Sequence, residues 1–218
     1  MVIKSLLIRP LTAAALFAVC GVSHAAFTVF TTAASFAAAT RAPGVDTYAG
    51  FSVVDSTPGP INRNAGAYAY TASASLSDFF GAGTIANPSL STQDNETSIT
   101  FFNIAGGATA IGGNFYNTDI LGNFISGAIT IVANDSFGAQ STQTITDATV
   151  SSFRGFLSTG TISSLVVTAV QPLIGDGIFP TVDNLTIAIA APVPEPETYA
   201  LMLTGLGVVG FVARRRRR

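Results

Sequence analysis

Short runs of hydrophobic and β-branched residues recur along the body of this sequence, separated by stretches rich in Gly, Asn, Asp and Pro. The run from Thr97 to Ile104 shows the pattern most clearly, because Ile99 and Phe101 fall on one face of an extended chain and their neighbours on the other. The stretch from Thr32 to Ala39 instead has helical spacing, and Pro43-Gly44 is expected to stop that helix. Further strands are predicted at 27–30, 68–72, 108–116, 127–133, 142–146, 161–170 and 181–189.

These runs predict an all-β fold for residues 26–190. Seven or eight strands without long intervening helices are typical of an antiparallel β-sandwich of the jelly-roll kind, here with one short N-terminal helix. A parallel α/β fold needs a crossover helix of about ten or more residues between strands, and none is visible.

The first 25 residues have a different pattern from the body. Lys4 and Arg9 precede an apolar run, Leu11 to Val19, and small residues follow up to Ala25. This order is typical of a cleavable secretory signal helix, so we predict cleavage between Ala25 and Ala26. A membrane anchor is the weaker alternative, because a span needs about 20 apolar residues.

Removal of this segment limits the chemistry of the mature protein. Lys4, Cys20 and His24 are the only residues of their types in the chain, and all three leave with the signal peptide. Lipidation of Cys20 is the alternative, which the branched Val19 before it disfavours. Without His, Cys or Lys, the usual nucleophile–base pairs and the zinc and copper sites are excluded. We therefore predict no enzymatic activity, no catalytic residue and no obligatory cofactor.

The body is acidic although the whole chain is nearly neutral. Residues 26–193 hold three arginines and ten carboxylates, which leaves a formal charge of −7. Such a surface repels phosphate, so no nucleic-acid partner is expected.

Carboxylates are the chemistry that remains. Asp94 and Glu96 lie in a loop before a strand, and Asp183 is expected near a strand end, so these three are weak calcium candidates. The favoured explanation at each position is an Asp that bonds its own backbone in a turn. A glycosidase needs two carboxylates beside a sugar cleft, and no local motif marks such a pair. A calcium-dependent carbohydrate-binding module, or less favourably a glycoside hydrolase, remains the alternative function.

The C-terminus has three parts. Residues 191–198 form a linker with Pro194, Glu195 and Pro196, whose prolines keep the backbone extended. Residues 199–213 are apolar and would form a transmembrane helix of about 22 Å, slightly short of a hydrocarbon core of about 30 Å. Bilayer thinning and snorkelling arginines would close that gap. A cytoplasmic stop signal follows at 214–218, which is Arg214, Arg215, Arg216, Arg217 and Arg218.

The order Pro-Glu-Pro, hydrophobic helix, arginine cluster resembles the PEP-CTERM sorting signal of exosortase substrates in Gram-negative bacteria. The residues from Pro194 to Leu203 and Gly205-Leu206-Gly207 match the sequence of this signal closely. The resemblance implies that a membrane-embedded exosortase is the partner and cleaves near Pro-Glu-Pro. The protein would then pass from transient inner-membrane anchoring to the outer surface or the extracellular space, in a context of exopolysaccharide and biofilm. A plain single-pass anchor is the alternative.

Three body segments resemble the β-sandwich domains that accompany this tag, namely Val45 to Tyr48, Arg63 to Tyr70 and Thr181 to Leu185. Those domains are mostly uncharacterised, so the resemblance implies fold and delivery but no ligand. We predict a structural salt bridge from Arg63 to a strand-end carboxylate such as Asp183, with a sugar contact as the alternative. Extracellular polysaccharide is a possible partner, and self-association through exposed edge strands stays open.

Overall fold

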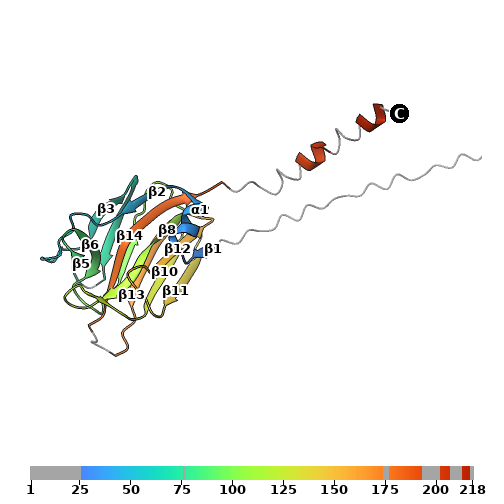
Figure 1. The fold of residues 1–218 in the computed structure, drawn as a ribbon. Coiled ribbons are helices and arrows are strands. Elements are labelled where there is room, and N and C mark those ends of the chain that lie inside the picture. The colour runs from blue at the N-terminus through green and yellow to red at the C-terminus, as the bar shows by residue number, and fades with distance from the viewer. Residues whose placement is uncertain (1–25, 76, 174–176, 193–201, 207–212, 217–218) are drawn as a thin grey trace, which may run out of the picture.

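Two antiparallel sheets pack face to face in the computed structural model, which describes residues 26–75, 77–173, 177–192, 202–206 and 213–216 (Figure 1). Sheet A has eight strands in the order β1-β12-β8-β14-β6-β5, with β2 also paired to β14 and β9 to β8. Sheet B has six strands in the order β11-β10-β13-β7-β4-β3. The elements are β1 (Phe27–Phe30), α1 (Ala33–Ala39), β2 (Thr40–Asp46), β3 (Ile61–Ala65), β4 (Tyr68–Ala74), β5 (Phe79–Thr84), β6 (Asn87–Thr92), β7 (Ile99–Phe102), β8 (Ala110–Thr118), β9 (Phe124–Ile125), β10 (Ile129–Asp135), β11 (Gln140–Ile145), β12 (Phe153–Ser158), β13 (Ile162–Ala169) and β14 (Phe179–Ala190). The predicted β-sandwich with one short N-terminal helix is confirmed.

Alternation along the strands builds the core between the sheets. In β7, Ile99 and Phe101 are fully buried while Thr100 and Phe102 are half-exposed, as the sequence pattern predicts. Sheet A meets them with large side chains from β8 and β12, including Phe115 and Phe156, which are also fully buried. Each such side chain contributes about 1.5–3 kcal/mol on burial, so the alternation accounts for the packing of the two layers.

The helix α1 covers part of the outer face of sheet A. Its N-cap is Thr32, whose side chain accepts a hydrogen bond from the Ser35 amide. Phe36 is buried there against Phe153, and it leaves no room for a Cβ at Gly155.

The helix ends at Ala39, where the predicted helical stretch ends, but Pro43-Gly44 is not what stops it. Thr40 already has extended geometry, and Pro43-Gly44 lies inside β2. Tertiary contact explains the difference, because β2 pairs with β14 and Gly44 packs directly on the backbone of Ala65.

The strand β14 runs the length of the sandwich, from a distal end to a proximal end where the body also begins. Phe27 at the start of β1 pairs with Ser158, whose amide donates to the carbonyl of Thr109. The amide of Ala190 donates to the Thr109 hydroxyl, so the body begins and finishes at one end, the proximal end. β14 has 12 residues and therefore runs about 36 Å, from Phe179 at the distal end to the proximal end.

Candidate functional site

A cavity of about 270 Å³, the distal cleft, lies on the outer face of sheet A near its distal end. Register places Phe80, Ser91, Thr181 and Tyr116 side by side on β5, β6, β14 and β8, and residues in register share one face. Val182, the neighbour of Thr181 along β14, points the other way into the core between the sheets. The cleft is lined by Phe80, Ser91, Thr92, Gln93, Thr118, Asp119, Ile120 and Phe179.

Hydroxyl groups form the floor of the distal cleft. Thr118 and Thr181 lie 2.8 Å apart at their hydroxyls, and Thr181 also donates to Ser91 at 3.1 Å. The Ser91 hydroxyl in turn donates a hydrogen bond to the carbonyl of Pro180 at 3.1 Å. These three side chains are almost fully buried, so the network satisfies groups that would otherwise be costly to bury.

The loop from β8 to β9 forms one wall. Asp119 accepts hydrogen bonds at Oδ1 from the amides of Leu121 and Asn123, both at 2.9 Å. Gly122 lies against Ala82 with positive φ, and its carbonyl accepts from the amide of Gly83 on β5. The loop is thereby held over the edge of the sheet.

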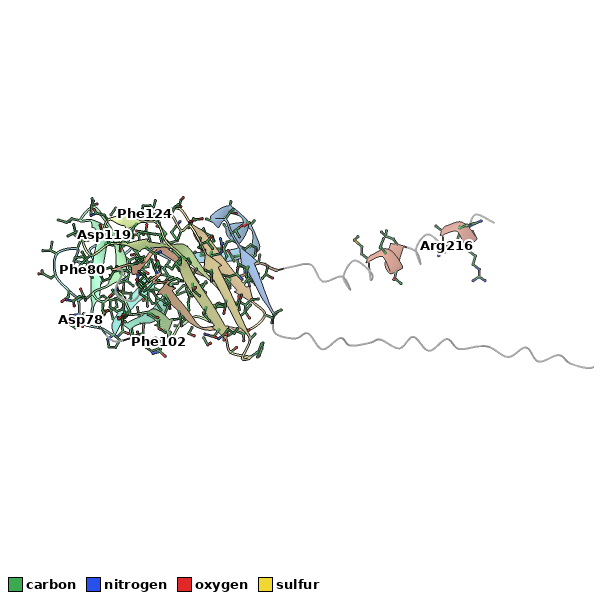
Figure 2. All side chains as sticks on the ribbon, turned by 90° about the horizontal axis from the view of Figure 1, so that it is seen from below. Asp78, Phe80, Phe102, Asp119, Phe124 and Arg216 are labelled. Carbon is green, nitrogen blue, oxygen red and sulfur yellow. The ribbon has the colours of Figure 1, made fainter. Side chains whose placement is uncertain are left out.

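Electrostatics narrows the class of ligand. The backbone hydrogen bond from Asn123, with those from its side chain and from Leu121, holds the pKa of Asp119 below its usual value, so the rim is anionic at neutral pH. No cation is among the described lining residues, and the exposed Gln93 side chain can both donate and accept hydrogen bonds. With Phe80 and Phe179 as apolar surface, the arrangement fits a neutral, hydroxyl-bearing ligand. Figure 2 shows Phe80, Asp119 and Phe124 along one side of the sandwich and Phe102 on the other.

A second groove of about 280 Å³ holds the predicted candidate Asp183. Tyr116 donates to the hydroxyl of Ser89 at 2.8 Å, and its ring lies 6.4 Å from that of Phe124. Burial raises the pKa of Asp183 despite the hydrogen bond from the Asn184 amide. Asp183 was expected near a strand end, but it lies within β14 where the register to β8 shifts, and Asn184 there has a positive φ.

The three calcium candidates do not form one cluster. Asp94 and Glu96 share the loop between β6 and β7, where Asp94 accepts from the Glu96 amide at 3.0 Å, while Asp183 lies in β14. In the described parts of the chain, no group of three acidic, His or Cys side chains is placed to hold a metal ion. The favoured turn role of Asp94 is thus observed, and calcium binding stays a prediction.

The predicted salt bridge of Arg63 exists, but its partner is Asp46 rather than Asp183. Arg63 donates from Nε to Oδ2 of Asp46 at 2.7 Å and from Nη2 to Oδ1 at 2.8 Å. The hydroxyl of Tyr70 donates to Oδ2 at 2.7 Å, and the amide of Tyr48 to Oδ1 at 2.8 Å. Asp183 is unsuitable because it faces the outer side of sheet A.

Charge and hydrogen bonding fix this cluster. Burial alone would raise the pKa of Asp46, but hydrogen bonds from Arg63, Tyr70 and the Tyr48 amide outweigh it and hold the pKa below the usual value. Burial and the Asp46 charge raise the pKa of Tyr70. The guanidinium also lies 5.2 Å from the Tyr48 ring centre and 5.8 Å from that of Phe51. This cluster joins two of the segments that resemble the domains accompanying the tag, Val45 to Tyr48 and Arg63 to Tyr70. The sequence pattern did not predict the pair, because Arg63 and Asp46 are 17 positions apart along the chain.

The processing signals lie largely outside the described residues. This applies to Ala25, to Pro194, Glu195 and Pro196, and to Arg217 and Arg218. Ala26 is exposed, and Arg214, Arg215 and Arg216 are exposed in a short helical segment at 213–216. Within the described ranges no helix is long and apolar enough to cross a membrane, and most of the predicted span at 199–213 falls outside them.

Comparison with known proteins locates one family feature. The model of the PEP-CTERM protein-sorting motif matches residues 192–218. No curated protein matches the chain. Among solved structures, the chain is similar to a mutant of a family 29 carbohydrate-binding module at 10% identity and a TM-score of 0.35, covering 79% of this chain and 99% of that one. A similarity this distant is no guide to a ligand.

Proposed function

We propose that this chain, which carries the PEP-CTERM protein-sorting motif and is therefore an exported exosortase substrate, is a non-enzymatic protein of the outer surface or extracellular matrix. The sorting motif is the observation on which the proposal rests. Its match begins at residue 192, two positions after β14 ends at Ala190, so the sorting segment follows the folded body. We place its role alongside exopolysaccharide in biofilm formation, which is the usual context of such substrates.

The direction of β14 supports display of the distal cleft. The sorting segment leaves from the proximal end, whereas the cleft lies about 36 Å away at the start of β14. A body held by its C-terminus during processing would turn the cleft away from the membrane.

A triple substitution tests the sorting step. Pro194→Ala, Glu195→Ala and Pro196→Ala together should leave the tail uncleaved and the protein in the inner-membrane fraction. The matched control replaces three exposed residues outside the motif, Val54, Asp55 and Ser56, by Ala. Unchanged surface display of the first variant would show that the motif does not direct sorting.

A second candidate function is binding of neutral carbohydrate in the distal cleft. It is supported by the apolar walls, by the exposed amide of Gln93 and by the absence of a cation among the described residues that line the cleft. Sugars present hydroxyls and apolar ring faces, which match Gln93 and Phe80 respectively.

Glycan-array binding of the protein, with calcium and with a chelator, tests this second function. Phe80→Ala should weaken retention at least tenfold, while Phe102→Ala, a half-buried Phe on the outer face of the other sheet, should leave it unchanged. Equal effects of both substitutions would remove the cleft from the proposal. Release of reducing sugars from a retained glycan would instead favour the hydrolase alternative.

A further inference from the structure

Six strands pair with a neighbour on one side only, and five of them are covered, short or interrupted. Of these, β2 contains Pro43 and shifts register against β14, and β9 has only two residues. In sheet A, Phe79 of β5 exchanges two backbone hydrogen bonds with Thr57, and Gly83 donates a third to Gly122. β1 has only four residues and leads into α1. In sheet B, β3 follows Pro60, and its last residue, Ala65, packs against Gly44 of β2. Such devices keep sheet edges from pairing with other chains.

The remaining edge, β11 in sheet B, has none of them. Its six residues, Gln140–Ile145, contain no proline, glycine or charge and pair with β10 without a register shift. Among the described residues, no backbone group outside β10 bonds to its backbone, and Figure 1 shows β11 at the margin of its sheet. Alternate residues of an edge strand direct their N–H and C=O groups outward, so roughly half of the β11 backbone groups face away from β10. One β11 carbonyl, that of Thr142, accepts from the side chain of Gln143 at 2.9 Å, a local bond that a second strand would displace.

Charge makes this edge the easiest place for two copies to meet. The body carries −7, which repels a second body at most surfaces. The face of sheet B that points away from sheet A carries Thr, Ser, Asn, Gln, Val, Ala and Phe side chains, and no charged residue, across its six strands. The two charged residues of sheet B, Arg63 and Asp135, lie at positions that point toward sheet A or are buried.

We propose that β11 pairs with β11 of a second copy, antiparallel and about a two-fold axis, so that sheet B continues from one molecule into the next. A two-fold axis lets each copy use the same strand, which closes the contact at a dimer. The shared edge is about 20 Å long, and it buries well under the roughly 800 Å² per partner of a stable interface. The association is therefore weak and needs a high local concentration, such as that of a crowded surface or matrix. It depends neither on the sorting proposal nor on the carbohydrate proposal.

Sedimentation of the full-length chain in mild detergent tests the pairing over a hundredfold range of concentration. The wild-type protein should approach twice its monomer mass at the upper end. Thr142→Lys and Thr144→Lys, each at an exposed position of β11, should stay monomeric because two lysines then meet near the axis. The matched control, Asn64→Lys, is exposed on β3 at the other edge of sheet B and should associate as the wild type does.

Cross-linking gives a second measurement on the same chain. Thr142→Cys should form an oxidised dimer in preference to Asn64→Cys by at least fivefold, with Cys20 common to both. A wild-type protein that stays monomeric throughout would overturn the proposal. Equal loss of association in the β11 and β3 lysine variants, or its persistence in both β11 variants, would also overturn it.

Discussion

Replacing Arg63 by Ala is the sharpest test of what holds the body together. The substitution removes two hydrogen bonds to Asp46, of 2.7 and 2.8 Å, and leaves a carboxylate that is only 5% exposed without its counter-charge. It also uncovers the rings of Tyr48 and Phe51 that flank the guanidinium.

The burial of the two partners sets the size of the effect. Breaking a fully buried ion pair from one side costs about 3–5 kcal/mol, because the other charge stays desolvated. The Arg63 side chain is 22% exposed, so water can reach Asp46 once it is gone, and the lower end applies. We expect a loss of about 3 kcal/mol in the free energy of unfolding at pH 7, or about 6–12 °C in Tm for a domain of this size.

Urea unfolding followed by tyrosine fluorescence measures this loss, since the chain has no Trp. Arg41→Ala is the matched control, because Arg41 is exposed and its removal should change the free energy by less than about 0.5 kcal/mol. If Arg63→Ala costs no more than Arg41→Ala, the Asp46 cluster does not stabilise the body and the reasoning fails.

The same pair predicts a pH dependence. The pKa of Asp46 is held below its usual value in the folded state, so the unfolded chain takes up this proton first as the pH falls. The stability that Asp46 contributes is therefore present above about pH 4 and is lost as the pH falls through its folded pKa. In Arg63→Ala, burial, already the largest influence, is opposed only by the Tyr70 hydroxyl and the Tyr48 amide and raises the pKa of Asp46, so protonation relieves the unpaired charge. The gap between the two proteins should narrow from pH 7 to pH 3.5.

Three further substitutions test packing and charge elsewhere in the body. Phe36→Ala should lower the free energy of unfolding by about 3–5 kcal/mol in urea titrations, because Phe36 is 2% exposed at the centre of the contact between α1 and sheet A. Gly44→Ala should cost at least about 2 kcal/mol by the same measurement, since the added Cβ would meet the backbone carbonyl of Ala65, which cannot rotate away. Asp183→Asn should raise stability at pH 7 by less than about 1 kcal/mol, because burial raises the pKa of Asp183 and the charged form is disfavoured in the fold. Calcium should then stabilise the wild type more than this variant if Asp183 is a ligand, and should affect both proteins equally if it is not.

Strands with a clean alternation were predictable, and strands that rely on their neighbours were not. β7, β10 and β13 match predicted runs because one face of each meets the core. β5 and β6 contain Gly81, Gly83 and Pro88, which argue against a strand in isolation. Both are nevertheless strands, because the β8–β9 loop and Thr57 form hydrogen bonds with the outer backbone groups of β5. No local sequence pattern shows these contacts.

The sequence by itself determined delivery, fold class and charge. The sorting motif at 192–218 is contiguous, so it is legible without the fold, as are the alternation of the strands and the body charge of −7. The tertiary structure alone decided that Arg63 pairs with Asp46, that hydroxyls from β6, β8 and β14 form the floor of the distal cleft, and that β11 is the open edge. The physical reason is distance along the chain. Each of these features joins strands that are separate in sequence, and pairing between distant strands is set by how the whole core packs rather than by any local pattern.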